Sequence, residues 1–291
     1  MDMFLALVGA FAGGVFGALF GGTTLFIFMG LMVLLGSAIA LSGGGDTFLL
    51  QVAFGTSFAP HIAFVGGVGA AAFYGRHRMN LSHDEEFAKS IEGFTGADTI
   101  TPLMKMKDIP TLLVGGLFGV VGFLLVTALI VMESPMDASA TTVAATGILA
   151  RLLFGKSGLT GKFSTGEKRY DLSANHIVFT AIWIAALAVV AFQVVSMTQV
   201  DVLMFGFSGL SLIVLYFGLP IPVTHHITLV TGTATLMFGN MAIAIAFGLL
   251  AGFLGNFFQR SFNTNVDSHV DNAALTIVVC TLLMTGIQAI L

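Results

Sequence analysis

Charge is what this sequence lacks most. Charged residues make up 9% of the 291 residues, whereas hydrophobic residues make up 56%. Soluble domains carry about a quarter charged residues, so this chain has too few charges to cover a water-facing surface of its size. We therefore expect most of the surface to face lipid, which predicts an integral membrane protein.

Two further absences narrow the class of protein. Cys280 is the only cysteine, which excludes a framework of intrachain disulfides. The eleven Lys and Arg residues are spread along the chain instead of forming a basic patch, so we expect no nucleic-acid partner. The first residues, Met1 to Phe4, include no basic region of the kind found in a cleaved signal peptide, and we expect the first apolar stretch to be retained.

Long apolar stretches take the place of the missing charge. A bilayer core needs about 20 helical residues, and the alternating pattern of a membrane β-barrel is missing. The predicted fold class is therefore all-α, a polytopic membrane protein of about ten transmembrane helices, some of them broken or short. The predicted spans are residues 4–20, 24–42, 49–75, 110–132, 139–155, 176–197, 202–219, 223–239, 241–258 and 271–291.

Lys and Arg fall on one side of this predicted arrangement. All eleven lie in, or at the edge of, alternate turns, and the turns between these hold none. Because cationic loops stay in the cytoplasm during insertion, we expect a multi-pass protein of the cell (cytoplasmic) membrane with both termini outside.

Two stretches hold too much glycine and proline for regular spans. The first runs from Gly43 to Pro60, before a helix predicted from about His61, and the second is Gly-Leu-Pro-Ile-Pro at 218–222. Non-helical backbone at membrane depth persists only where protein or a watery cavity satisfies it, and such breaks mark binding sites in transporters. The two stretches are either broken helices of this kind or ordinary turns at the membrane surface.

The two halves of the chain share short sequences in the same order. Residues 61–65, 137–143 and 116–119 resemble residues 226–230, 271–277 and 248–251. Each half has five predicted spans, an odd number, so the second half enters the membrane from the opposite side. We therefore expect two inverted repeats of five helices, an arrangement that places its site near the membrane midplane.

The repeat defines the predicted domains. Residues 1–155 form the first five-helix repeat, which includes an inner-face loop at 76–109, and residues 176–291 form the second. A basic inner-face linker, residues 156–175, joins them. Within the loop, Ser82 and Glu85 form a capping box that predicts a short amphipathic helix on the inner surface.

Hydroxyl and imidazole groups are the candidate site residues. Thr228 and Thr231 belong to a row of threonines on one helix face, which either replaces the water around a solute or binds neighbouring helices. Histidine is costly in a membrane, so His61, His225 and His226 are either functional or tied to a backbone carbonyl at the interface. The predicted substrate-binding residues are His61, Thr142, Thr146, His225, His226, Thr228, Thr231, Asn272 and Thr276, together with Asp137 and Asp271.

The two aspartates start spans that the repeat makes equivalent. An Asp at the start of a helix is usually an N-cap, but the symmetric placement of Asp137 and Asp271 leaves ion coupling or a role at a pore mouth open. No charged residue falls at the middle of a span, which favours a neutral or weakly charged solute. No Cys partner or spaced set of His and Glu lies in a span, so we expect no metal and no cofactor.

The second half resembles the urea transporters, whose architecture is related in outline to that of the ammonium transporters. Residues 226–230, His-Ile-Thr-Leu-Val, resemble an Asn-Ala-Thr-Leu-Val segment of that family, and residues 272–275, Asn-Ala-Ala-Leu, resemble part of its Leu-Pro-Phe-Asn signature. The resemblance implies two inverted five-span halves and a homo-oligomer, a trimer or a dimer, with a pore in each subunit. Leu-Pro-Phe-Asn itself does not occur, and His stands where the family has Asn, so the family's substrate does not carry over.

The sequence thus predicts a membrane transporter or channel, not an enzyme. It would pass a small polar solute through a pore within each subunit. The alternative is a proton- or sodium-coupled secondary transporter of a small metabolite or ion. An intramembrane enzyme is a third class, but no set of nucleophile and base supports it.

Overall fold

The computed structural model describes residues 2–79 and 91–291, and within these residues every regular element is a helix. The α-helices are α1 (Met3–Phe20), α2 (Gly22–Leu41), α3 (Val65–His77), α5 (Ile109–Val131), α6 (Ala138–Phe154), α7 (Ala174–Thr198), α8 (Leu203–Ser211), α9 (His225–Phe238), α10 (Met241–Phe262) and α11 (Asn272–Gln288). The predicted all-α class is confirmed. The surface helix predicted from Ser82 lies outside the described residues.

Five helices are long and apolar enough to cross a membrane: α1, α2, α5, α7 and α10. They expose large apolar side chains such as Phe4, Leu113 and Phe179, which suits a surface in contact with lipid. The other helices are shorter. For example, α6 and α11 have 17 residues each, which gives a length of about 26 Å, less than the roughly 30 Å of a bilayer core.

Both stretches rich in glycine and proline lie between helices and are not regular α-helix. Before α3, the chain forms two single π-helical turns, η1 (Leu49–Ala53) and η2 (Pro60–Phe64). Pro60 stands at the first position of η2, where its missing N–H leaves no bond unmade. Before α9, α8 continues as a 3₁₀ segment, η4 (Leu212–Phe217), and residues 218–224 are not helical.

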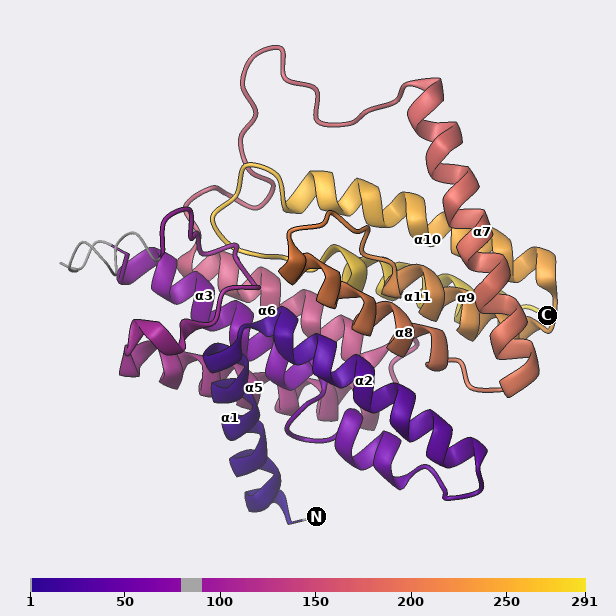
Figure 1. Cartoon of the computed structure of the whole chain (residues 1–291), viewed down its shortest axis with the longest axis horizontal. Coiled ribbons are helices and arrows are strands. Elements are labelled where there is room, and N and C mark those ends of the chain that lie inside the picture. The colour runs from indigo at the N-terminus through magenta and orange to yellow at the C-terminus, as the bar shows by residue number, and fades with distance from the viewer. Residues whose placement is uncertain (1, 80–90) are drawn as a thin grey trace.

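The helices of the two halves have corresponding neighbours. In the first half α1 packs against α3 and α5, and α3 packs against α5 and α6; in the second half α7 packs against α9 and α10, and α9 packs against α10 and α11. Two further contacts join the halves, α2 with α8 and α6 with α11. In Figure 1 the first helices of the chain lie on one side of the molecule, and α7 and α10 lie on the other.

A shared glycine spacing accompanies these contacts. The pattern Gly-x₃-Gly-x₂-Gly occurs in α5 at residues 115, 119 and 122, and in α10 at residues 248, 252 and 255. A Cβ on Gly122 would lie 1.8 Å from the carbonyl oxygen of His61, and a Cβ on Gly255 would lie 2.2 Å from Nε2 of His226. The two matched histidines thus meet glycines at the same place in this spacing. The spacing pairs residue 248 with residue 115, whereas the sequence comparison paired it with residue 116.

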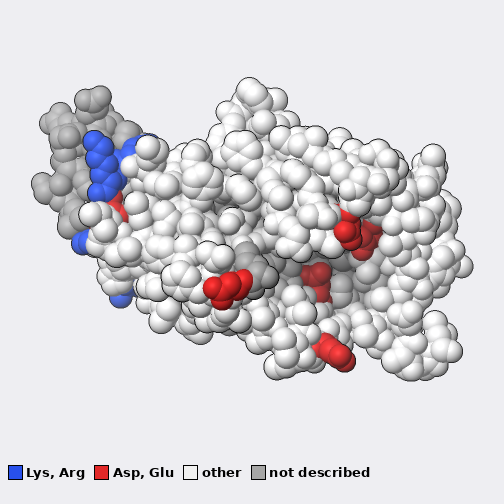
Figure 2. All heavy atoms as spheres, turned by 90° about the horizontal axis from the view of Figure 1, so that it is seen from below, with Lys and Arg blue, Asp and Glu red and all other residues white. Residues whose placement is uncertain are grey.

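The loops that carry Lys and Arg meet at one end of the molecule. Arg78 pairs with Asp108 at 3.3 Å, which joins the end of α3 to the start of α5. The N–H of Lys156 donates to Oδ2 of Asp267 at 2.7 Å, and Gly96 lies against the carbonyl oxygen of Asp267. On the face seen in Figure 2, the Lys and Arg side chains gather at one end.

The close contact of α1 with α5 provides a test of this packing. A Cβ on Gly14 would lie 2.2 Å from the carbonyl oxygen of Gly115, so Gly14→Ala forces two backbones apart. We expect this variant to lose about 1–3 kcal/mol of stability, the usual cost of overpacking, measured as a lower Tm in detergent.

The matched control is Gly286→Ala in α11, where the added Cβ meets no atom within 4 Å. This exchange should be neutral or stabilising by up to about 1 kcal/mol, because Ala has the higher helix propensity. An equal change in Tm for the two variants would contradict the predicted contact.

Candidate functional site

A cavity of about 540 Å³ lies where the two halves meet. Its walls come from α2, α6, α8, α9 and α11, from η2 and η4, and from the loops before α6 and α11. Residues that the sequence comparison pairs lie on both sides of it: Phe64 with Leu229, and residues 137, 140 and 143 with residues 271, 274 and 277. Segments of both halves that match in sequence therefore contribute to the cavity.

The starts of α6 and α11 reach this cavity from opposite ends. Oδ1 of Asp137 accepts a hydrogen bond from the N–H of Ala140 at 2.6 Å, and Oδ1 of Asp271 accepts one from the N–H of Ala274 at 2.6 Å. Both are therefore the N-caps that the sequence predicted. The N–H of Asp137 in turn donates to Oγ1 of Thr281 at 3.0 Å.

This bond between Asp137 and Thr281 also sets the distance between the two caps. Thr281 is ten residues after Asp271 on α11. At a rise of about 1.5 Å per residue, the two caps lie about 15 Å apart along this helix. Thr281 is also seven residues before Gln288, the last residue of α11, so the start of α6 lies about 10 Å inside that end of α11.

Each of these two helices also holds the loop that precedes the other. Arg151, in the last turn of α6, is buried and donates to Oγ of Ser268 at 2.8 Å and to the carbonyl oxygens of Ser268, Phe262 and Leu159. At the equivalent place in α11, Thr285 donates to the carbonyl oxygen of Pro135 at 3.0 Å. These bonds hold both capped starts inside the bundle.

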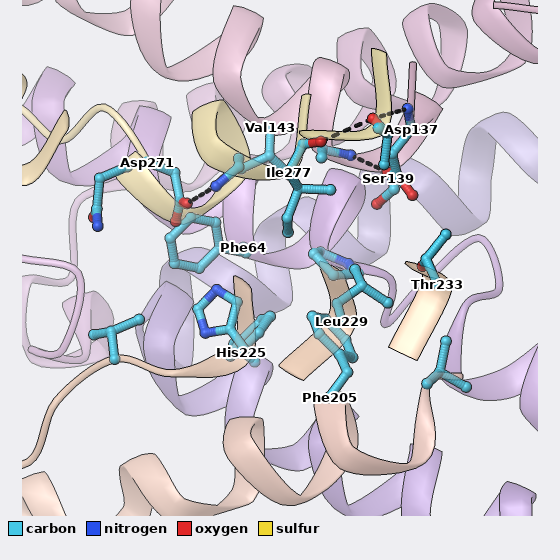
Figure 3. Close-up of a pocket in the computed structure, with 18 of the residues that line it drawn as sticks. Phe64, Asp137, Ser139, Val143, Phe205, His225, Leu229, Thr233, Asp271 and Ile277 are labelled. Atoms are coloured by element: carbon cyan, nitrogen blue, oxygen red, sulfur yellow. Dashed lines mark hydrogen bonds between the residues drawn. The ribbon is translucent and has the colours of Figure 1, made fainter. Parts of the chain in front are cut away.

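The centre of the cavity is apolar. Figure 3 shows Asp137 and Asp271 on opposite sides, with Val143 and Ile277 between them. Phe64, Phe205 and Leu229 line the facing wall. The cavity thus has a carboxylate at each end and hydrocarbon in its middle.

His225 adds one polar group to this apolar wall. It begins α9, is 8% exposed and lines the cavity. Its ring lies 4.6 Å from the ring of Phe26 and 5.7 Å from that of Phe205, centre to centre. Its Nδ1 has no hydrogen-bond partner among the described residues. His225 therefore leaves one buried nitrogen unpaired in the wall of the cavity.

His226 faces a different space. It lines a second cavity of about 400 Å³ between α7, α9 and α10, together with His176 and Asn256. Val223, Gln259 and Asn272 line both cavities and therefore lie between the two. The adjacent histidines therefore serve different cavities.

The predicted hydroxyl row lies outside the main cavity. Thr142, Thr146 and Thr276 donate to carbonyl oxygens of their own helices, and Thr228 does the same to His225. Thr231 is buried against Gly248. The hydroxyl of Thr228 also lies 3.1 Å from Oγ of Ser208, which joins α9 to α8. The bonded hydroxyls of this set therefore bond to helix backbone or to a neighbouring helix.

His61 and Asn272 lie beside the cavity in different ways. His61 does not line it, but its Nδ1 lies 2.9 Å from Oγ of Ser139, which does. Asn272 lines both cavities, and its amide donates to the carbonyl oxygen of Gly255 at 3.2 Å. The structure thus brings His225, Asn272 and the two capping aspartates together around the main cavity, and the seven other predicted residues do not line it.

Several residues that shape the site were not among those predicted. Ser139, Asp201, Gln259 and His269 line the main cavity. Arg151 holds the loop before α11 through its bond to Ser268. Asp201 lies at the end of a predicted span, and a single Arg inside an apolar helix is rare enough to be a signal of its own. Ser139, Gln259 and His269 carry no comparable pattern in the sequence.

Within residues 2–79 and 91–291, no three side chains of His, Cys, Asp or Glu come together as metal ligands would. Asp137 and Asp271, about 15 Å apart along α11, are too far apart to hold one ion between them.

Comparison with protein families gives one match. Residues 1–176 and 175–291 match the model of a family of unknown function (DUF7973). The chain belongs to this family. The two matched segments of the chain meet at residues 175 and 176. This position is the end of the predicted linker. No curated protein and no solved structure matched the chain in these comparisons.

The role of Arg151 as an anchor can be tested. Arg151→Met removes a buried cation that satisfies Ser268 and two further carbonyl oxygens. Because these acceptors are left unpaired, we expect a loss of about 2–5 kcal/mol of stability and faster hydrogen exchange in residues 264–271. Arg260→Met is the control, because Arg260 is exposed at the end of α10. Unchanged exchange in the Arg151 variant would exclude the anchor.

Proposed function

We propose that this protein is a membrane transporter or channel that passes a small polar solute through the cavity between its halves. The observation that carries the proposal is the pair of capped helix starts, Asp137 and Asp271, which reach one cavity from opposite ends. Polar helix ends inside an apolar bundle are costly unless they face protein or a watery path. A solute path explains why both are present.

We further propose that the chain is an inverted repeat of two five-helix halves. Three observations support it: the corresponding helix neighbours, the shared glycine spacing and the two segments of the chain that match the family model. In such a repeat α6 and α11 are equivalent helices of opposite direction, which suits their mutual anchoring. The loops rich in Lys and Arg then lie in the cytoplasm, and both termini lie outside.

This topology predicts which loops a membrane-impermeant thiol reagent reaches. In a Cys280→Ala background, Thr47→Cys lies in the loop after α2 and Thr165→Cys in the loop after α6, and both positions are exposed. We expect labelling of residue 47 from outside intact cells and labelling of residue 165 only after lysis. Labelling of both from outside would overturn the predicted topology, because the two loops would lie on the same side.

The apolar middle of the cavity suits a gate. Phe64, Phe205 and Leu229 present hydrocarbon between the two carboxylate ends. A hydrated solute cannot cross such a region until side chains or helices move aside. The polar ends would then receive a solute, and the middle would control its passage.

The cavity also supports a second candidate, an ion-coupled carrier. Three aspartates line the cavity, Asp137, Asp201 and Asp271, whereas the sequence suggested no charge away from the span ends. A carboxylate that binds H⁺ or Na⁺ together with a solute would couple their movements. Uptake that follows an imposed gradient of H⁺ or Na⁺ in proteoliposomes would separate this carrier from a channel.

Blocking the cavity tests the path itself. Leu229→Trp replaces an aliphatic side chain that lines the cavity with a bulkier indole ring. We expect it to reduce solute flux into proteoliposomes at least tenfold while the Tm is largely retained. Leu236→Trp is the control, because Leu236 lies two turns further along α9, is 42% exposed and does not line the cavity. Equal flux through the two variants would place the path elsewhere.

A further inference from the structure

We infer that the solute is an elongated organic cation with a positive group at each end, of the type of an aliphatic diamine. This inference rests on the proposed function and names the substrate class of the same cavity. It depends on three observations: the charge of the cavity, an unpaired histidine in its wall, and the distance between its carboxylates.

The charge of the cavity excludes anions. Asp137, Asp201 and Asp271 line it, and none of the described residues around it is Lys or Arg. The positive end of a helix dipole is equivalent to roughly half a charge, so it offsets only part of each capping carboxylate. Nε2 of His269 also lies 3.5 Å from Oδ2 of Asp271. An anion would leave water to face these carboxylates, whereas a cation would exchange water for them.

His225 adds a polar group of a different kind to the cavity and favours a ligand that donates hydrogen bonds. More than nine-tenths of its surface is buried, it lines the cavity, and its Nδ1 has no partner among the residues described. Neutral imidazole offers one acceptor nitrogen. An ammonium group supplies N–H donors for such a nitrogen, and the ring of Phe26 beside it favours a cation at its face.

The distance between the carboxylates indicates the length of the ligand. The two caps lie about 15 Å apart along α11, and a charge-assisted hydrogen bond takes about 2.8 Å at each end. The two nitrogens of a bridging ligand are then about 9 Å apart. Between them the walls are Val143, Ile277, Phe64 and Leu229, which match a chain of methylene groups.

A small inorganic cation fits this cavity less well. A metal ion needs several oxygen or nitrogen ligands around one point, and the described residues include no such group. The carboxylates instead act at separate ends, with hydrocarbon between them. A volume of about 540 Å³ is also within the range of sites for organic molecules.

Binding to the purified protein in detergent tests the inference without any need for transport. The probes are α,ω-diaminoalkanes of graded length, with the diol and the monoamine of matching length as controls, measured by titration calorimetry and by the shift in Tm. We expect the tightest binding when the nitrogens are about 9 Å apart, and at least tenfold weaker binding of the diol and of the monoamine. Equal binding of diamine and diol, or no dependence on length, would overturn the inference.

Substitutions of the caps locate the binding site. Asp137→Asn and Asp271→Asn remove a charge but keep an N-cap, because Asn caps a helix as well as Asp does. Each should weaken diamine binding at least tenfold and abolish the preference for length. Asp2→Asn, at the exposed cap of α1, is the matched control and should bind as the native protein does. Unchanged binding in both cavity variants would overturn the inference, and if these variants do not fold, the length series on the native protein still decides.

The same series in proteoliposomes separates the two proposals. If diamines do not bind and the Leu229→Trp block still stops the flux of a neutral solute, the substrate class is wrong and the path stands. If diamines bind with the expected length but no solute crosses, the ligand class stands and transport is wrong. Flux of diamines that the Leu229→Trp variant blocks would support both.

Discussion

The antiparallel contact between α6 and α11 is the constraint on which the rest of the structure depends. Each helix holds the loop before the other, through Arg151 to Ser268 and through Thr285 to Pro135. Both helices therefore start inside the bundle, and their first N–H groups need partners that lipid cannot supply. Aspartate caps supply them, and the same carboxylates then face the cavity. Because α6 and α11 are too short to span a bilayer, their starts lie inside the bundle. The same short pair of helices therefore accounts for the aspartate caps, for the cavity that the caps face and for the negative charge of that cavity.

The two halves share this plan but not the strength of their contacts. Arg151 makes four hydrogen bonds to the loop before α11 and to its surroundings, all at the end rich in Lys and Arg. Thr285 makes one bond to the loop before α6. Glycines let α1 approach α5 at Gly14, whereas the second cavity lies between α7 and α10. The second half therefore has more room to rearrange around the site than the first.

The sequence predicted the helices well, because lipid imposes long apolar runs, and glycine and proline mark their ends. It predicted the caps Asp137 and Asp271 for the same reason, since an Asp at a helix start has one common role. It could not predict how deep in the bundle these two helix starts lie, because a cap inside the bundle and a cap at the membrane surface have the same local sequence. It also suggested that threonines such as Thr142 line a path, but a buried threonine in a helix can satisfy its hydroxyl with the carbonyl four residues before it. Periodicity shows which face such a residue occupies and says nothing of what lies opposite.

A carboxylate that caps a helix is a suitable ligand for a molecule that must leave again. The cap fixes Oδ1 on the helix N–H, at 2.6 Å in both halves, so the side chain is oriented before any solute arrives. The positive end of the helix and the positive group of a solute then compete for the same carboxylate, which weakens binding relative to a free Asp. Passage through a membrane requires binding that is favourable enough for entry and weak enough for release. An N-cap in a cavity combines these two requirements in one side chain, and the starts of α6 and α11 supply one for each end.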